Sequence, residues 1–204
     1  MIKPSWILFL FCTLIAGQDL QNRSIAHLQV DVSKHWFVPA WSITNLRVKA
    51  PNNTNVFVGV GFRGKSWWVE QMVQKQWNGD GGLTALDTRV VKRWGQKQKT
   101  VSYFEAGPFL SQKGFFWSSY TDTVVWRKLG LGVGTENVHK PGPDMVAIGP
   151  RVALSLGRFA GFDISTTGEF RFVPFEQPTK IGGHPREIRL YVLFNKRIAL
   201  ADRK

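Results

Sequence analysis

Cysteine is almost absent from this chain, and its scarcity excludes several classes of protein. The 204 residues include one cysteine, Cys12, which lies in an apolar stretch near the N-terminus. A single cysteine cannot form the disulfide framework that stabilises many small secreted modules, nor can it form a cysteine-based zinc site. The chain is nevertheless long enough to fold as one domain with a sizeable core and no such cross-links.

Long hydrophobic runs are also missing. The apolar stretch from Trp6 to Ala16 is too short for a helix that spans a bilayer, and no later segment is long enough either. The stretch follows Lys3 and ends in the small residues Ala16 and Gly17, which is the pattern of a secretory signal. The sequence therefore predicts a signal peptide over residues 1–18 and an exported mature protein.

Helical spacing of apolar residues is not found after this signal. Instead, apolar residues alternate with charged residues and glycines, which is the pattern of strands with two unlike faces. Between Phe162 and Phe172, for example, Ile164 and Phe170 share one face, while Glu169 lies on the other. The same alternation recurs in four other windows: 56–63, 129–136, 146–157 and 187–195.

Turn-forming segments separate these windows and predict a single all-β domain. Counting back from the C-terminus gives about ten antiparallel strands, within a range of roughly eight to twelve, and 42–50 is the first of them. We therefore expect an N-terminal lead-in over 19–41, a β-barrel domain over 42–200 and a tail over 201–204. The expected connections are 50–55, 64–66, 78–84, 95–98, 111–113, 122–123, 137–144, 157–161 and 174–186.

Three features predict that the polar face lines the inside of this barrel and that the apolar face contacts a membrane. Glycines such as Gly59, Gly130 and Gly132 lie on the polar face, where they leave room for arginine side chains and let the strands bend. Aromatic residues such as Trp67 and Trp77 bracket candidate strands, as expected at two membrane interfaces. Most short connections fall at one end of the barrel and most long ones at the other.

With this patterning the chain resembles small bacterial outer-membrane β-barrel proteins as a class, over roughly residues 42–200. The resemblance implies a single antiparallel transmembrane β-barrel, monomeric, surrounded by outer-membrane lipid and lipopolysaccharide, and inserted by the barrel-assembly machinery. Pro108 and Pro150 lie within predicted strands of a barrel that has no free edge, so we expect bulges or strand ends there.

Charged residues on the predicted inner face are the best candidates for a functional site. Glu169 and Arg171 share a face of one strand about 7 Å apart, and Arg189 on the next strand could complete a cluster with Asp163 or Glu169. Confined charges must pair, so such a cluster is either a plug that fills the barrel or a narrow constriction that favours anions. The full inner set is Arg63, Glu70, Lys128, Glu136, Arg151, Asp163, Glu169, Arg171 and Arg189.

The chain is strongly basic, with a formal net charge of +13, which falls to +12 without residues 1–18 because these contain one charged side chain, Lys3. In an exported barrel the expected counter-charges are anionic lipids, lipopolysaccharide phosphates or anionic solutes, and we expect no nucleic acid. Lys140, Lys180 and Arg186 are predicted to contact lipopolysaccharide phosphates from loops and the rim.

Two alternatives remain open at this point. A soluble all-β protein in the periplasm or outside the cell, such as a calycin-like barrel, would turn its apolar face inward around a ligand. An outer-membrane enzyme that modifies lipid would use His139 or His184, but neither lies beside a nucleophile motif. The sequence contains no metal-ligand pattern, phosphate loop or dinucleotide fingerprint, so we expect neither a cofactor nor an enzyme.

Overall fold

The computed structural model describes residues 19–47, 52–77, 82–139, 145–176 and 186–200. The predicted signal peptide and the predicted tail, 201–204, lie outside the described residues. The described chain forms eleven β-strands and one short 3-10 helix, η1 (Gln96–Gln98). The strands are β1 (Asp19–Asp31), β2 (Trp36–Arg47), β3 (Asn53–Arg63), β4 (Trp67–Trp77), β5 (Thr84–Trp94), β6 (Thr100–Pro108), β7 (Phe115–Trp126), β8 (Leu129–His139), β9 (Met145–Phe159), β10 (Phe162–Glu176) and β11 (Arg186–Ala199).

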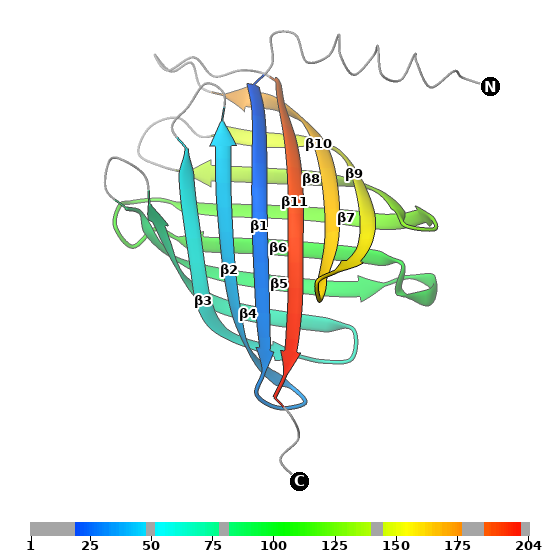
Figure 1. Ribbon diagram of the computed structural model, residues 1–204. Coiled ribbons are helices and arrows are strands. Elements are labelled where there is room, and N and C mark those ends of the chain that lie inside the picture. Colours follow the sequence, from blue (N-terminus) through cyan, green and yellow to red (C-terminus); the bar gives the residue numbers. More distant parts are fainter. Residues whose placement is uncertain (1–18, 48–51, 78–81, 140–144, 177–185, 201–204) are drawn as a thin grey trace, which may run out of the picture.

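The strands close into one barrel in which each strand pairs with its neighbours in sequence, so the prediction of an all-β barrel is confirmed. The count is eleven, one more than expected and within the expected range. Neighbouring strands are antiparallel throughout, but the barrel closes through a parallel pairing of β1 with β11. This follows from the odd number of strands, because the first and the last must then run in the same direction (Figure 1).

The segment predicted as an N-terminal lead-in is part of the barrel. Residues 19–41 supply all of β1 and the first half of β2, so the barrel begins at Asp19. β1 pairs with β2 from Gln21 to Asp31 and with β11 along its whole length. Its outward face carries the exposed polar residues Asn22 and Ser24. The apolar alternation that identifies the other strands is therefore weak in β1.

The connections at one end of the barrel are short, and we call this the turn end. They are 32–35, 64–66, 95–99, 127–128 and 160–161. The opposite end, the loop end, holds the connections that follow β2, β4, β6, β8 and β10. One expected turn is misplaced, because β7 continues through Asp122 to Trp126 and the chain reverses at Arg127, where φ is 44°.

The two prolines in predicted strands behave differently. Pro108 is the last residue of β6, as expected for a strand end. Pro150 lies inside β9, opposite Val133 of β8, with no register shift between these strands. On its other side, the β9–β10 pairing is interrupted at Pro150 and shifts register beyond Ile148, so an irregularity lies close to this proline but the strand does not end there. The exposed side chain of Pro150 points out of the barrel.

Apolar side chains cover the outside of the barrel, and charged side chains fill its inside. On the outer face, Val60 is 56% exposed and Val133 is 53% exposed. On the inner face, Glu70 is 0% exposed and Arg189 is 2% exposed. A water-soluble barrel has the reverse arrangement, with an apolar interior and a polar exterior. The alternation in the sequence assigned these two faces correctly.

Candidate functional site

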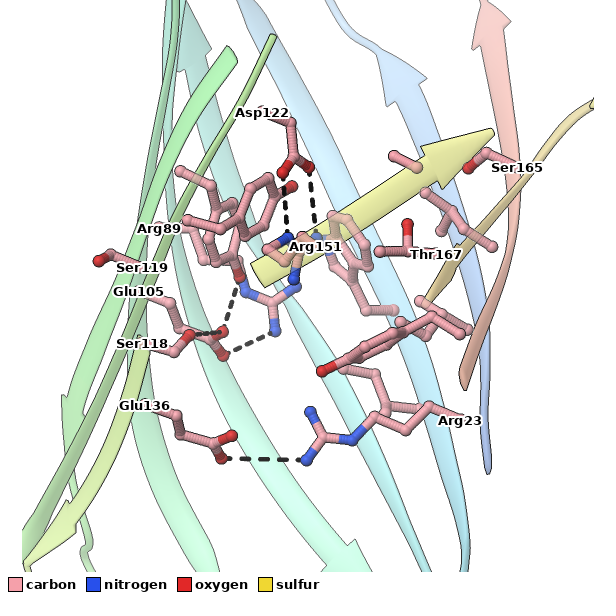
Figure 2. Close-up of a pocket in the computed structure, with 18 of the residues that line it drawn as sticks. Arg23, Arg89, Glu105, Ser118, Ser119, Asp122, Glu136, Arg151, Ser165 and Thr167 are labelled. Atoms are coloured by element: carbon pink, nitrogen blue, oxygen red, sulfur yellow. Dashed lines mark hydrogen bonds and ion pairs between the residues drawn. The ribbon is translucent and has the colours of Figure 1, made fainter. Parts of the chain in front are cut away.

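The interior of the barrel contains a cavity of about 790 Å³. Its lining extends from Asn45 and Asn53 near the loop end to Lys99 and Lys128 near the turn end. Between these ends, charged side chains from different strands project into the lumen and pair with one another (Figure 2). Two groups of these side chains can be distinguished by their composition.

Four arginines and three carboxylates form the larger group, on the wall that comprises β7 to β11 and β1. All of them are buried or half-buried. We call this group the arginine-rich cluster: Arg23, Arg151, Arg171, Arg189, Asp122, Glu136 and Glu169. Charges removed from water are stable only when they are paired. The importance of each member therefore depends on which opposite charges it contacts.

Glu136 lies at the centre of the arginine-rich cluster. Its Oε2 accepts hydrogen bonds from Arg171 and Arg189, and its Oε1 lies 3.9 Å from Nη2 of Arg23. These arginines project from β10, β11 and β1, so one carboxylate of β8 holds together four strands around the parallel seam. Hydrogen bonds between charged groups are about twice as strong as neutral ones, and Glu136 therefore fixes the geometry of this wall.

Arg151 links the remaining two carboxylates of this cluster. Its Nε donates to Oδ1 of Asp122 at 3.1 Å, and its Nη1 donates to Oε2 of Glu169 at 3.2 Å. The guanidinium carbon lies 4.0 Å from the ring centroid of Tyr120, a cation–π contact. Glu169 also accepts a hydrogen bond of 2.7 Å from the hydroxyl of Tyr191. Arg151 and Glu169 thus each have at least two polar or aromatic partners, and Asp122 binds Arg151 through both of its oxygens.

Glycines of β8 provide the space for these ion pairs. A Cβ atom at Gly134 would lie 2.5 Å from Oε1 of Glu169 and 2.8 Å from Cδ of Arg151. At Gly132 it would lie 2.1 Å from Oδ1 of Asp122. All three contacts are shorter than van der Waals separation, so no larger residue fits without displacing the cluster. Gly132 and Gly134 therefore leave room for the charged cluster, whereas Gly130 has only ordinary contacts and Gly59 lies against Gln71 and Met72.

A second group, on β4, β5 and β6, has the opposite proportion of charges. We call it the acid-rich cluster, and it consists of Arg89 with Glu70, Asp87 and Glu105. Nη2 of Arg89 lies 2.7 Å from Oδ2 of Asp87 and 3.3 Å from Oε1 of Glu105. Oε1 of Glu70 and Oδ1 of Asp87 are buried without a hydrogen-bond partner among the described residues. Arg89 therefore forms ion pairs with Asp87 and Glu105. It is also the register partner of Glu70, whose Oε1 lies 4.0 Å from Nε2 of His27.

Aromatic rings enclose the acid-rich cluster. The guanidinium carbon of Arg89 lies 4.5 Å from the ring centroid of Trp41 and 4.4 Å from that of Phe57. Trp41 also donates from Nε1 to Oε2 of Glu70 at 2.9 Å, and the ring of His27 stacks on it at 3.7 Å. These cation–π contacts hold the guanidinium of Arg89 in place at the wall of the cavity.

The strand register explains how charges of opposite sign come together in both clusters. Side chains of register partners on neighbouring strands lie close to one another on the same face. Both clusters contain a row of three register partners with alternating charge: Glu70, Arg89 and Glu105 on β4 to β6, and Arg151, Glu169 and Arg189 on β9 to β11.

Most of the charges predicted on the inner face do lie in the lumen. Glu70 belongs to the acid-rich cluster, and Arg63 instead pairs with Asp31 near the turn end. Five predicted residues meet in the arginine-rich cluster: Glu136, Arg151, Glu169, Arg171 and Arg189.

Two predicted inner residues lie elsewhere. Asp163 is exposed next to the β9–β10 turn, and Lys128 is exposed in the β7–β8 turn, at the edge of the cavity. Both stand at the turn end, where the barrel opens to solvent. Arg189 therefore forms its ion pair with Glu136 of β8, and not with the more distant Asp163.

Of the three residues predicted to contact lipopolysaccharide, the structure describes only Arg186. Lys140 and Lys180 lie outside the described residues, and Arg186 is the first residue of β11. Of the two histidines considered for catalysis, His139 is the last residue of β8, and His184 lies outside the described residues.

Sequence reasoning missed five members of the two charge clusters: Arg23, Asp87, Arg89, Glu105 and Asp122. The strands that carry them alternate less cleanly than the glycine-rich windows, and Asp122 had been assigned to a turn. A signal was nonetheless present on β5, where Asp87, Arg89 and Val91 occupy alternate positions and are all buried. Two charges at this spacing on a strand share a face.

No group of three or more histidine, aspartate, glutamate or cysteine side chains within the described residues is arranged to hold a metal ion. Among the same residues, no helix is long and apolar enough to cross a membrane. In comparisons with known proteins, no family model matches the chain, and neither a curated protein nor a solved structure matches it.

Proposed function

We propose that this protein is an outer-membrane β-barrel with a narrow lumen that favours anions. The observation that carries the proposal is the inverted barrel, apolar outside and charged inside. A barrel is one of two folds that satisfy every backbone polar group within a bilayer, and lipid requires an apolar exterior. The alternative of a soluble, calycin-like binding protein requires an apolar interior, and the two charge clusters argue against it.

The length of the strands supports insertion in a membrane. β4 begins at Trp67 and ends at Trp77, which are 40% and 54% exposed. Ten residues of extended chain tilted by about 40° cover about 25 Å along the barrel axis. This is about the height of the apolar band in outer-membrane barrels, which is flanked by aromatic residues at both interfaces.

The charges that line the cavity support a preference for anions. The lining includes seven arginine or lysine residues and three acidic residues. Among the cations, Arg93, Lys99 and Lys128 are exposed near the turn end and form a positively charged mouth. A confined positive potential concentrates anions and repels cations. On this proposal the ion-paired clusters determine the width of the path, and the positively charged mouth determines that anions are preferred over cations.

The proposed surroundings follow from the same class of protein. The barrel would be exported by the predicted signal peptide and inserted as a monomer by the barrel-assembly machinery, with lipopolysaccharide in the outer leaflet. Its short turns would face the periplasm and its long loops the outside. The proposal assigns no catalytic residue and no cofactor.

Membrane fractionation followed by single-channel recording tests the proposal. The full chain is expressed with its own leader in a Gram-negative host, and its gel mobility is compared with and without heating. Outer-membrane recovery with a heat-dependent shift is expected for the barrel. In planar bilayers under a salt gradient, the reversal potential should then indicate anion preference.

A variant of the mouth sharpens this test. Lys99→Gln combined with Lys128→Gln should reduce the anion preference without changing the mobility shift, because both side chains are exposed. Lys75→Gln, outside the cavity near the loop end, is the control and should leave the reversal potential unchanged. Recovery of soluble protein would overturn the membrane barrel, whereas insertion without conductance would leave a barrel that is plugged by its ion pairs.

A further inference from the structure

Every connection at the turn end combines an exposed basic residue with an exposed aromatic residue. The cations lie in the turn or within two residues of it, and the aromatic residue is the first or the last of a flanking strand. We call these ten residues the turn-end collar: Lys34 with Trp36, Lys65 with Trp67, Lys97 with Trp94, Arg127 with Trp126, and Arg158 with Phe159.

The aromatic members of the collar are large apolar side chains left in contact with the surroundings. Trp126 is 63% exposed, Phe159 is 74% exposed, and Trp36, Trp67 and Trp94 are 40 to 54% exposed. Amphipathic rings at strand ends are typical of the level of lipid headgroups, where one side is apolar and the other is wet. The rings thus place the cations beside them at the height of the phosphates.

The cations of the collar have few acidic neighbours. Among the described residues at this end, the acidic side chains are Asp31 and Asp163. Asp31 already binds Arg63 and Arg197. The guanidinium of Arg127 lies over the ring of Trp126, at 5.1 Å, which orients it without neutralising it. The positive charge of this rim therefore remains available to anions from outside the molecule.

We propose that the turn-end collar binds the phosphates of anionic glycerophospholipids in the leaflet that surrounds this end of the barrel. This inference rests on the proposed function, because it requires the barrel to lie in a membrane. Long-loop and short-turn asymmetry places the turn end at the periplasmic leaflet, and this leaflet is made of glycerophospholipids. A ring of five cations, one at each turn, matches a ring of phosphates around the barrel.

The collar is distinct from the mouth of the cavity. Its five cations do not line the cavity, whereas Arg93, Lys99 and Lys128 do. The collar should therefore select lipids and leave ion selectivity unchanged, and the mouth should do the reverse. Each basic residue at an anionic surface strengthens binding by roughly fivefold, and the attraction declines within a Debye length as salt is added.

Tryptophan quenching by brominated lipid measures this selection directly. The full-length protein is reconstituted into phosphatidylcholine vesicles that contain either brominated phosphatidylglycerol or brominated phosphatidylcholine at the same fraction. Preferential binding by the collar predicts stronger quenching by the anionic lipid at low salt and a loss of this excess at high salt. The exposed tryptophans of the collar are themselves the reporters.

The decisive variant replaces the five collar cations together: Lys34→Gln, Lys65→Gln, Lys97→Gln, Arg127→Gln and Arg158→Gln. Its preference for phosphatidylglycerol should fall at least about tenfold. The control is Lys75→Gln with Lys113→Gln, two exposed cations near the loop end, and it should keep the full preference.

Each outcome decides a different point. Insertion into phosphatidylcholine with a heat-dependent mobility shift, but equal quenching by both lipids, would overturn the collar and leave the membrane barrel intact. A preference that survives the collar substitutions would also overturn it. Selective enrichment of lipopolysaccharide by the collar in place of phosphatidylglycerol would overturn the assignment to glycerophospholipid. Failure to insert into any vesicle would overturn both proposals.

Discussion

The two charge clusters in the lumen contain the same kinds of side chain in opposite proportions. In the acid-rich cluster, Arg89 is the single cation for three carboxylates. In the arginine-rich cluster, four arginines share three carboxylates, and Glu136 alone contacts three of them. Arg89 is thus the scarce charge of the acid-rich cluster, whereas carboxylates are the scarce charges of the arginine-rich cluster, and Glu136 contacts more of its arginines than any other carboxylate does.

This difference implies that the cost of a substitution depends on the wall on which it is made. Removing the scarce partner leaves several buried charges without compensation, which is strongly destabilising. Removing a member of the majority relieves repulsion among the rest and costs little. Matched substitutions in the two clusters therefore test whether charge balance, and not burial alone, determines the stability of the barrel.

The largest effect is expected for Arg89→Met. It leaves Glu70, Asp87 and Glu105 without a cation and removes the cation–π contact with Trp41, so the free energy of unfolding should fall by about 3–5 kcal/mol. Urea unfolding of the protein in lipid vesicles, followed by tryptophan fluorescence, measures this loss. Arg23→Met is the matched change in the other cluster and should cost less than about 1 kcal/mol, because arginine is in excess there.

Glu136→Gln is expected to have the next largest effect, about 3 kcal/mol. The amide keeps the size of the side chain and one acceptor oxygen, but it removes the charge that Arg171 and Arg189 share. A double-mutant cycle isolates this pairing: Arg171→Met in the Glu136→Gln background should cost less than Arg171→Met alone. Strict additivity of the two changes would show that Glu136 does not hold the cluster together.

The sequence predicted the barrel and its inverted faces because both depend on an alternation of period two. The windows at 129–136 and 146–157 show it most clearly, since glycine and arginine alternate there with valine and leucine. The sequence predicts a strand over 26–32 but places it outside the barrel, because the count back from the C-terminus makes 42–50 the first strand. The start of β1 was not predicted, because Asn22 and Ser24 interrupt the apolar residues of its outward face. The parallel pairing of β1 with β11 follows from the odd total number of strands. The pattern within a single segment does not reveal this total, so the pairing could not be predicted.

The contacts within the clusters could not be predicted to the same extent. Alternation shows which face a charge occupies, but the register of neighbouring strands decides which charges meet. Glu169 and Arg171 were placed on one face correctly, whereas the role of Glu136 depends on four strands and was not visible. Asp122 was not assigned to the inner face, because a turn was expected at 122–123. The sequence therefore did not identify the carboxylate that binds Arg151 through two hydrogen bonds.

Gly134→Val tests whether space limits the arginine-rich cluster. The added methyl groups would displace Glu169 and Arg151, which are already fixed by ion pairs, and the expected loss is about 1–3 kcal/mol in the same unfolding assay. Gly168→Val is the control, because a Cβ there lies 3.9 Å from Leu190 on the outer face, in ordinary contact. A loss of similar size at both positions would indicate an effect of strand glycines in general.

Asp87→Asn should have the smallest effect, within about 1 kcal/mol in either direction, although its side chain is 0% exposed. Oδ2 of Asp87 accepts from Nε of Arg89 at 2.9 Å, and an asparagine oxygen can replace it. The second oxygen has no hydrogen-bond partner among the described residues, so its replacement removes an excess negative charge and no bond. Glu169→Gln, the same change in the arginine-rich cluster, weakens ion pairs with Arg151 and Arg171 and should cost several times more. Equal losses from the two substitutions would mean that burial, and not the proportion of charges, decides what each cluster tolerates.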